Sequence, residues 1–225
     1  DIVEDIAIGF GFQNLPLKLS TTHLDALPLN NSNLKRRVGE SMRACGLQEV
    51  QSLTLSNERD QFENVRWPNE GYVTEIANPI TSDHTLLRQY ILPSLLRLLA
   101  ANRHHELPQR VYELGDVIRD SKNFLRAAWA CAEVGSGFTS SKGIVQALVR
   151  DMGAIQDDVV FRATEAEDGP WINGRGSHVF IRDEKIGEFG EIDPKVSGFF
   201  GIKSPIQAGE IDLEAIYRII PDPIS

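Results

Sequence analysis

Several stretches of the chain place apolar residues every three or four positions, the spacing of an amphipathic helix. Residues 2–10 show this spacing until Gly11, which predicts a short helix at the start of the chain. A second helix is predicted over residues 34–46, with Gly46 as its stop. The candidates for its N-cap are Asn31, Ser32 and Asn33, and its apolar stripe consists of Leu34, Val38, Met42 and Cys45. Such a stripe needs a partner surface.

Four further helices follow from spacing and from proline position. Pro93 is placed at the first turn of a leucine-rich helix, and residues 138–151 form another that closes at Gly153. A first-turn proline at position 194 predicts a short helix to about Phe200. The last helix is predicted over residues 213–218 with Asp212 as its cap.

Between these helices the pattern changes to alternation with a period of two, which indicates half-buried strands. Residues 49–55 are predicted to form one strand. The predicted strands that follow cover residues 110–114, 117–119, 125–134, 177–181, 186–192 and 206–211. Gly115 and residues 120–123 are expected to be turns, and residues 182–185 a hairpin. Strand runs interrupted by helices without regular alternation predict an α+β fold, one sheet covered on a face by helices.

Net charge and cysteine spacing exclude several functional classes. The chain has 225 residues, with 23 Lys and Arg against 32 Asp and Glu, so its net charge is -9. This excludes a free-standing nucleic-acid binder held by a basic surface, so DNA is not an expected partner and any RNA contact is local or shared. Cys45 and Cys131 are isolated and indicate neither a disulfide framework nor a zinc site.

Neither a membrane helix nor a secretion signal is predicted, so we expect a cytoplasmic protein. The chain opens on Asp1, already within a helical pattern, and is expected to be a piece of a longer polypeptide with one main domain and a short appendage.

Three carboxylates in the first helix are the candidate metal ligands. Asp1, Glu4 and Asp5 stand at i, i+3 and i+4, which puts them on one helix face where magnesium or calcium could be held by oxygen ligands. The alternative is that they favour the positive end of the helix dipole. Spacing alone favours the dipole explanation and leaves the metal role open.

The remaining candidates have ordinary structural explanations. His104 and His105 are adjacent and therefore point to different sides of a helix, so they are not a metal pair. The glycine-rich segments 135–137 and 174–177 lack the spacing of a phosphate loop and are expected to be turns. Arg119, followed by Asp120, is placed to reach a phosphate or carboxylate, although a surface hairpin arginine is the more common explanation.

A series of short segments, in order along the chain, carries a resemblance to a known family. They include residues 1–12 (DIVEDIAIGFGF), 46–50, 78–79, 87–88, 92–96, 111–115 (VYELG), 138–143, 172–176, 186–194 and 210–213. Together they resemble the beta subunit of phenylalanine–tRNA ligase in the form typical of archaea and eukaryotes. The resemblance covers nearly the whole chain.

The resemblance implies a class II aminoacyl-tRNA synthetase-like antiparallel sheet flanked by helices, in a tetramer of two alpha and two beta subunits that binds tRNA. Residues 1–20 would end a preceding acidic-helix domain and linker, and residues 21–225 would form the synthetase-like domain. The helix over residues 34–46 would pack at the subunit interface, so Val38→Asp is expected to weaken assembly with alpha and leave the fold intact.

The resemblance also implies where the chemistry lies. Catalytic class II domains carry an Arg-x-Glu strand and loop for ATP and a later helix with another Arg, whereas here only Arg119-Asp120 survives and residues 210–216 lack an Arg. No residue of this chain is therefore expected to be catalytic, and ATP is expected at the alpha subunit. The alternative is an active ligase domain that forms aminoacyl-adenylate itself.

The family's magnesium positions match Asp1, Glu4 and Asp5, which favours the metal role over the dipole role for these carboxylates. One further acidic ligand is implied upstream of Asp1. We therefore expect this chain by itself to bind magnesium weakly or not at all.

Overall fold

A computed structural model describes residues 1–16, 18, 32–135, 137–165 and 168–220. The chain divides into two compact units, residues 1–30 and 31–225. The expected boundary between residues 20 and 21 lies outside the described residues, as does the cap candidate Asn31. The two units are described separately.

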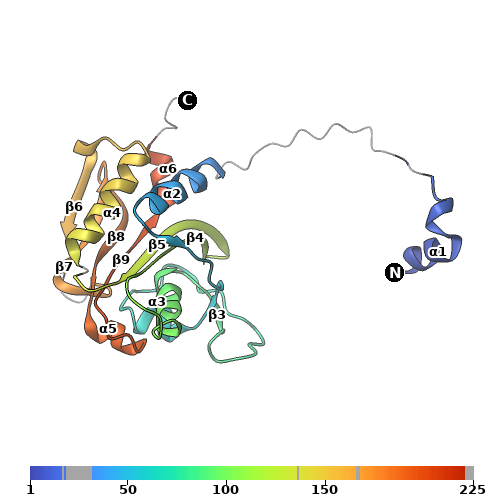
Figure 1. The fold of residues 1–225 in the computed structure, drawn as a ribbon, viewed down its shortest axis with the longest axis horizontal. Coiled ribbons are helices and arrows are strands. Elements are labelled where there is room, and N and C mark those ends of the chain that lie inside the picture. The colour runs from blue at the N-terminus through green and yellow to red at the C-terminus, as the bar shows by residue number, and fades with distance from the viewer. Residues whose placement is uncertain (17, 19–31, 136, 166–167, 221–225) are drawn as a thin grey trace. The chain divides into compact units, whose positions relative to one another are not determined.

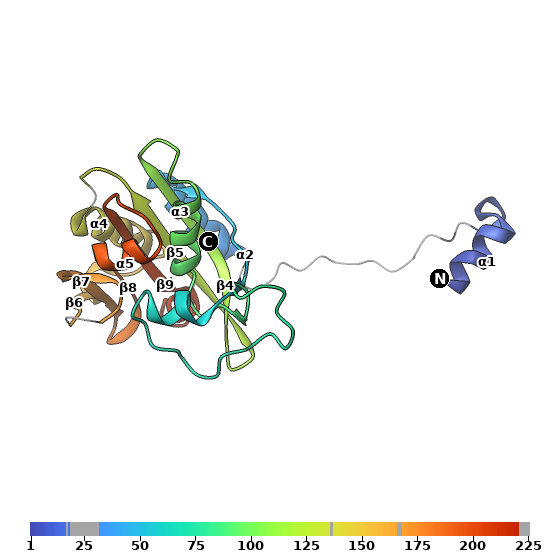
Figure 2. The same ribbon diagram turned by 90° about the horizontal axis from the view of Figure 1, so that it is seen from below.

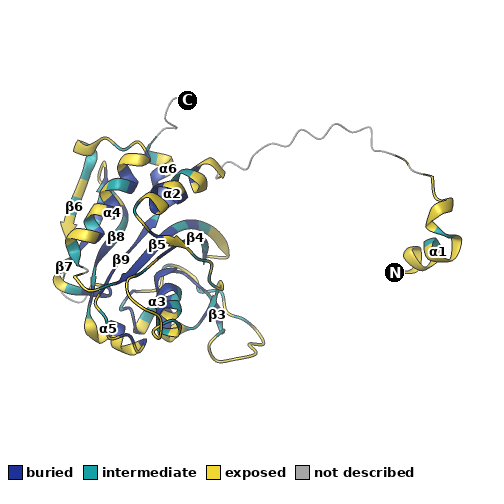
Figure 3. Ribbon diagram, viewed as in Figure 1, coloured by how far each residue is buried: buried dark blue, intermediate teal, exposed yellow. Residues whose placement is uncertain are grey.

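The first unit contains the predicted opening helix. Helix α1 spans Ile2–Phe10, and a short 3-10 turn η1 spans Phe12–Asn14. The helix ends at Gly11, whose φ of 87° is a left-handed conformation that glycine adopts without steric cost. None of its residues is buried, and Figure 3 shows most of its surface exposed.

The second unit contains the other helices and all of the described strands. The helices are α2 (Ser32–Ala44), α3 (Leu92–Ala101), α4 (Phe138–Asp151), α5 (Pro194–Phe199) and α6 (Leu213–Ile219), with a short π-helix η2 (Arg59–Glu63) and a short 3-10 helix η3 (Gln156–Asp158). The strands are β1 (Gln48–Glu49), β2 (Leu55–Ser56), β3 (Leu86–Leu87), β4 (Gln109–Arg119), β5 (Lys122–Ala132), β6 (Val159–Ala163), β7 (Trp171–Ile181), β8 (Glu184–Ile192) and β9 (Ile206–Asp212). Each helix predicted from spacing is confirmed within a few residues.

Seven strands form one mixed sheet in the order β1-β4-β5-β9-β8-β7-β6. All neighbours are antiparallel except β1 and β4, which run parallel. Strands β2 and β3 form a separate two-stranded sheet. The α+β class is confirmed, with one parallel pair that the antiparallel expectation lacked (Figure 1).

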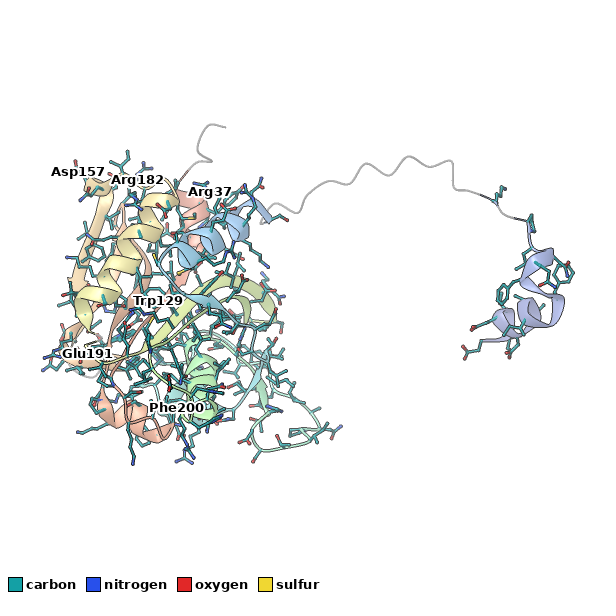
Figure 4. The ribbon with its side chains drawn as sticks, in the orientation of Figure 1. Arg37, Trp129, Asp157, Arg182, Glu191 and Phe200 are labelled. Atoms are coloured by element: carbon teal, nitrogen blue, oxygen red, sulfur yellow. The ribbon has the colours of Figure 1, made fainter. Side chains whose placement is uncertain are left out.

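Helices cover both faces of the sheet, so the prediction of a single covered face is wrong. On one face α2, α4 and α6 pack on odd-numbered β5 residues such as Trp129, and on the other α3 and α5 pack on even-numbered ones such as Ala130. Figure 2 shows α3 and α5 on the face turned to the viewer. Figure 4 places Trp129 in the middle of this sandwich. Because strand residues alternate in direction, β5 contributes to both cores, and its run of small apolar residues follows from that.

Strand β4 is longer than predicted because Gly115 is not a turn. The residue lies within β4, paired with Arg126 of β5. A Cβ built there would come within 2.4 Å of the Arg88 guanidinium and 3.0 Å of the Glu113 carboxylate. Glycine is therefore required for close approach of the Arg88–Glu113 ion pair, not for a change of chain direction.

Two other turn predictions are confirmed and one strand prediction is wrong. Asp120 and Ser121 join β4 to β5, and Arg182 and Asp183 join β7 to β8, in each case with positive φ at both residues. Residues 49–55 do not form one strand. Their ends belong to β1 and β2, which lie in different sheets.

The apolar stripe of α2 packs within this chain. Val38 and Met42 are fully buried and Leu34 is 8% exposed, in the core shared with α4. The expectation that this stripe waits for the alpha subunit is wrong, because it is already covered. Val38→Asp would place a charge in the domain's own core, so we now expect a loss of stability in that variant and not an intact fold.

Candidate functional site

A cavity of about 200 Å³ lies beside the hairpin that carries Arg119. Arg119 is the last residue of β4, Arg126 lies in β5, and Glu210 lies in β9 between them and β8. The loop before β3 supplies Trp67 and Glu70, and Tyr90 follows β3. The sheet therefore brings together residues from five separate stretches of sequence.

Arg119 is held by a carboxylate and by aromatic rings. Its Nη1 forms an ion pair with Glu70 Oε2, and its guanidinium carbon lies 5.8 Å from the centre of the Tyr90 ring and 6.0 Å from that of Phe124. Its side chain is 14% exposed. Burial, together with the neighbouring Arg126, lowers the pKa of Arg119 despite the Glu70 carboxylate.

Arg126 and Glu210 form the floor of the cavity. Arg126 Nη1 lies 3.2 Å from Glu210 Oε1, and Arg126 Nη2 lies 3.6 Å from Glu70 Oε2. The other Glu210 oxygen accepts hydrogen bonds from the backbone N–H groups of Ile91 and Leu92, both 2.9 Å long. Burial raises the pKa of Glu210, against these stabilising partners. Glu210 thereby ties β9 to the start of α3.

Tyr90 belongs to the core under α3 and α5, and the guanidinium groups of Arg119 and Arg126 lie over its ring. The Tyr90 and Trp67 ring centres are 4.6 Å apart, with the two planes tilted by 36°. The Tyr90 hydroxyl donates to the Pro68 carbonyl oxygen at 2.7 Å and contacts Glu70 Oε1 at 3.1 Å. Burial and the Glu70 charge raise the pKa of the Tyr90 hydroxyl. The hydroxyl is consequently a fixed hydrogen-bond donor and not an acid at physiological pH.

The turn next to Arg119 is short and is held in place by a hydrogen bond. It consists of Asp120 and Ser121 alone, and the Asp120 carboxylate accepts a 2.6 Å hydrogen bond from the backbone N–H of Tyr72. The Arg119-Asp120 pair singled out in the sequence is thus partly a structural hairpin, as one of its two interpretations predicted. Arg119 itself faces the cavity and not bulk solvent.

The predicted metal ligands do not form a cluster that could hold a metal ion in the described part of the chain. Asp1, Glu4 and Asp5 are exposed on α1, and in the part of the chain that the structure describes no three His, Cys, Asp or Glu side chains are grouped to hold a metal ion. These three carboxylates alone do not fit a magnesium site, so their role stays a prediction that requires a ligand from elsewhere.

The two adjacent histidines lie beyond the end of α3, not on a helix. The rings of His104 and His105 face each other, with centres 4.2 Å apart, so the expectation that they point to different sides is wrong. The glycines of segment 174–177 lie inside β7, so the expectation that they form turns is wrong. The pairing of β7 with β8 shifts register between Trp171 and Gly176.

Sequence reasoning missed most of the cavity. Arg126, Glu210, Glu70 and Tyr90 were not expected to carry a function. A signal was present for two of them, since Arg126 and Glu210 are charged residues with apolar or small neighbours inside predicted strands. Glu70 and Tyr90 come from irregular segments, for which the sequence offers no periodicity.

Comparison with known proteins supports the resemblance. The family model described as "Phenylalanyl tRNA synthetase beta chain CLM domain" matches residues 15–213. Proteins named phenylalanine–tRNA ligase beta subunit are similar over almost the whole chain. That of Archaeoglobus fulgidus is 34% identical over 219 residues, which is 96% of this chain and 39% of that protein.

Two further relatives with the same name give the same result. That of Methanococcoides burtonii is 36% identical over 215 residues, covering 95% of this chain and 38% of that protein. That of Pyrococcus horikoshii is 34% identical over 225 residues, covering 97% and 39%. The chain thus spans less than two fifths of the length of these relatives. It belongs to the family of phenylalanyl-tRNA synthetase beta chain CLM domains.

Proposed function

We propose that this domain is the non-catalytic, class II synthetase-like module of a phenylalanine–tRNA ligase beta subunit. In this role it supports assembly with the alpha subunit, while ATP is bound and phenylalanine is attached to tRNA through the alpha subunit. The family assignment supports the beta-subunit part of this proposal. The non-catalytic part rests on the cavity, and the assembly part rests on an exposed loop described below.

The observation that carries the proposal is the engagement of Arg119. An arginine that serves a nucleotide must present its donors to phosphate oxygens. Here one end of Arg119 is taken by Glu70, and the hairpin beside it turns in two residues, which leaves no long loop to cover a nucleotide. The cavity of about 200 Å³ is also smaller than the several hundred Å³ typical of nucleotide-sized ligands.

The alternative is an active ligase domain that forms aminoacyl-adenylate itself. Its support is that two arginines, Arg119 and Arg126, still line one cavity. Calorimetric titration of this chain with ATP and with phenylalanine separates the two possibilities. We expect no binding of either compound, and retained binding would favour the active domain.

Assembly requires a surface other than the covered stripe of α2. The loop of residues 68–85, which projects from the domain in Figure 1, exposes Tyr72 and Ile80, the latter at 99%. Exposed apolar side chains of this size favour protein contacts over solvent. We therefore place alpha-subunit contacts on this loop.

A paired substitution tests this surface. Ile80→Asp is expected to weaken co-purification with the alpha subunit while the urea midpoint of the beta chain stays unchanged, because Ile80 packs on nothing. Lys203→Asp, at another exposed position, is the matched control. Equal assembly of the Ile80→Asp and control proteins would remove the loop from the interface.

Aminoacylation of tRNA with phenylalanine tests the function as a whole. This chain alone, alpha alone, and alpha with full-length beta are compared. We expect activity only in the complete mixture, as in a tetramer of two alpha and two beta subunits working in the cytoplasm, and activity from this chain alone would establish the alternative. Magnesium binding is expected only when the segment preceding Asp1 is present, which calorimetry on the longer chain checks.

A further inference from the structure

Strand β6 forms one edge of the seven-stranded sheet, because the strand order ends at β7 and β6. Figure 1 shows β6 at the outer side of the sheet. The strand at the other edge, β1, has two residues, whereas β6 has five. The outward N–H and C=O groups of an edge strand are a template for pairing with another chain. Of the two edges of this sheet, β6 therefore offers the longer backbone to a further strand.

The pairing of β6 with β7 shows which backbone groups face outward. The N–H of Arg182 donates to the Asp158 carbonyl oxygen at 3.1 Å, and the N–H of Thr164 donates to the Gly176 carbonyl oxygen at 3.2 Å. The register between these contacts is unbroken. Because successive residues of an antiparallel strand direct their backbone groups to opposite sides, the odd-numbered residues of β6 direct theirs away from β7. These residues are Val159, Phe161 and Ala163.

A groove of about 510 Å³ lies between this strand and α4. Val159 and Phe161 line it from β6, and Lys142, Gln146 and Arg150 are among the residues that line it from α4. Two residues whose backbone groups face outward therefore also contribute side chains to the groove. A strand paired with β6 would place every second side chain on the same face, above the groove. Backbone hydrogen bonds combined with a groove for alternate side chains are the requirements of peptide binding by strand addition.

The charge of the groove indicates the kind of strand that fits it. Of the described residues that line it, Lys142 and Arg150 are cationic and none is acidic. Lys142 Nζ lies 4.9 Å from the centre of the Phe161 ring, so the ammonium group lies directly beside the strand. Arg150 is 75% exposed and pairs with Asp151 at its own surface. The uncompensated charge next to β6 is thus that of Lys142.

The opposite face of β6 is also apolar and cationic. Val160 is 41% exposed there. The Arg162 guanidinium carbon lies 4.2 Å from the centre of the Phe180 ring, and Arg162 Nη2 lies 3.3 Å from Asp183 Oδ1. Cationic side chains therefore lie on both faces of this strand, in a chain whose net charge is -9. An added strand with acidic side chains is complementary to both faces, whereas a basic one meets repulsion.

We propose that the outer edge of β6 binds an extended acidic segment of a partner protein, which continues the sheet as a further strand. An acidic side chain opposite Phe161 would lie beside Lys142. Asp157 and Asp158, which precede β6, disfavour a second acidic side chain at that end. This edge is distinct from the loop of residues 68–85, so the two surfaces can be occupied independently.

Hydrogen exchange of the β6 backbone tests whether the edge is open and whether it pairs. In the free chain the N–H groups of Val159, Phe161 and Ala163 should exchange quickly, and those of Val160 and Arg162 slowly, because only the latter are bonded to β7. A capped peptide of alternating valine and glutamate should slow the exchange of the odd-numbered residues. Slow exchange of these residues in the free chain at every protein concentration would show that the edge is already covered. Slowing that depends on protein concentration without peptide would assign the edge to a second copy. Either result would overturn the proposal.

Modified peptides separate strand addition from simple charge attraction. Methylating the backbone nitrogens of the glutamates removes one set of N–H groups, and methylating those of the valines removes the other. Only one set faces β6 in a paired strand, so binding should be lost with one methylated peptide and kept with the other. A peptide with lysine in place of glutamate should bind more weakly than the parent. Equal binding of the two methylated peptides, or of the lysine and glutamate peptides, would contradict strand addition by an acidic segment.

A charge reversal connects binding to the groove. Lys142→Glu should lower the affinity for the glutamate peptide about three- to tenfold, because an attraction becomes a repulsion, and should raise the affinity for the lysine peptide. Lys122→Glu is the matched control, since Lys122 is exposed on β5 and strands β9, β8 and β7 lie between it and β6. The control should bind both peptides as the unaltered chain does. Equal affinities of the two variants for the glutamate peptide would remove the groove beside α4 from the binding surface.

Discussion

At the scale of single residues, one buried ion pair stands apart from the other charged contacts. Arg88 Nη2 lies 2.7 Å from Glu113 Oε1, and the two side chains are 2% and 1% exposed. The remaining donors of Arg88 reach the Asp116 carbonyl oxygen and the Ser52 hydroxyl. Such a pair links β4 to the chain before α3 and is costly to break, because its partner is left charged and buried.

Arg88→Met is therefore expected to lower the free energy of unfolding by about 3–5 kcal/mol, since it leaves Glu113 unpaired. Replacing both partners, as Arg88→Met with Glu113→Leu, should recover much of that loss. Urea unfolding of the two variants makes the comparison. A double variant no more stable than the single one would show that packing around Gly115, and not the unpaired charge, sets the cost.

Val38 provides a second residue whose role is set by burial. Val38→Asp should lower the free energy of unfolding by several kcal/mol, because an unpaired carboxylate would enter the core between α2 and the sheet. Lys35→Asp, exposed on the same helix, is the control and is expected to stay within about 0.5 kcal/mol. An unchanged urea midpoint for Val38→Asp would mean that the apolar stripe of α2 is not part of this domain's core and is free to contact a partner.

Which residues are buried was largely predictable, whereas what covers them was not. The spacing of Leu34, Val38 and Met42 marks a buried stripe correctly, yet spacing contains no information on whether the cover belongs to the same chain. Arg119 was identified from its position at a hairpin. Its neighbour Glu70 lies 49 positions earlier in an irregular segment, and only the folded chain brings the two together.

At the scale of elements, α2 and α4 are joined by a polar contact at the edge of their shared core. Ser41 Oγ donates to Asp151 Oδ2 at 2.7 Å, and Arg37 donates to the Asp151 carbonyl oxygen at 2.9 Å. The hydrogen bond from Ser41, aided by Arg150, lowers the pKa of the Asp151 carboxyl. The folded state therefore favours the charged form of Asp151.

This lowered pKa gives the contact a defined pH dependence. Because the folded pKa lies below the unfolded value of about 3.9, the stabilisation is present above that pH and is lost as the pH falls through the folded pKa. Asp151→Asn should be less stable at pH 7 by up to about 1 kcal/mol, reduced by solvent screening of a side chain that is 34% exposed. The difference should shrink on acidification below about pH 4.

Urea midpoints of the unaltered chain and of Asp151→Asn, measured across that pH range, check this expectation. Asp157→Asn is the matched control, because Asp157 is exposed on η3. A difference for Asp151→Asn that persists unchanged into acid would mean that the amide loses packing and not a charge-assisted hydrogen bond.

Elements were predicted best where one period runs without interruption. Helices α3 and α4 match their expected residues because apolar spacing and Pro93 agree. Strand β4 was divided in the prediction because Gly115 is usually a turn residue, and its actual reason, the approach of Arg88, is a tertiary contact. Residues 49–55 alternate like one strand, but their ends pair with different partners, a choice that alternation does not determine.

At the scale of the whole molecule, the central sheet gives the larger unit two cores. The odd and even residues of β5 face opposite layers of helices, so this one strand contributes side chains to both cores. The sequence indicated an α+β fold but assigned helices to one face, because periodicity identifies which side of a helix is buried and not which side of the sheet it covers. The cavity of Arg119 lies on the face covered by α3 and α5, since Tyr90 belongs to that core and Glu210 accepts hydrogen bonds from the start of α3.

Among the described residues of the first unit, none has a buried side chain. Helix α1 exposes Ile2, Val3, Ile6 and Phe10, and none of its residues is buried. Residues 31–225 have both cores and all of the ion pairs around the cavity. A chain of residues 31–225 should therefore unfold cooperatively with a Tm within about 2 °C of that of the 225-residue chain, because no core packing is removed.

The same deletion should reduce self-association, since it removes the apolar surface of α1. Calorimetric scans give the Tm, and sedimentation at several concentrations gives the mass of both chains. A Tm that falls by many degrees would mean that α1 packs on the larger unit and stabilises it. If self-association is unchanged, the exposed loop of residues 68–85 and not α1 is responsible for it, which Ile80→Asp then tests directly.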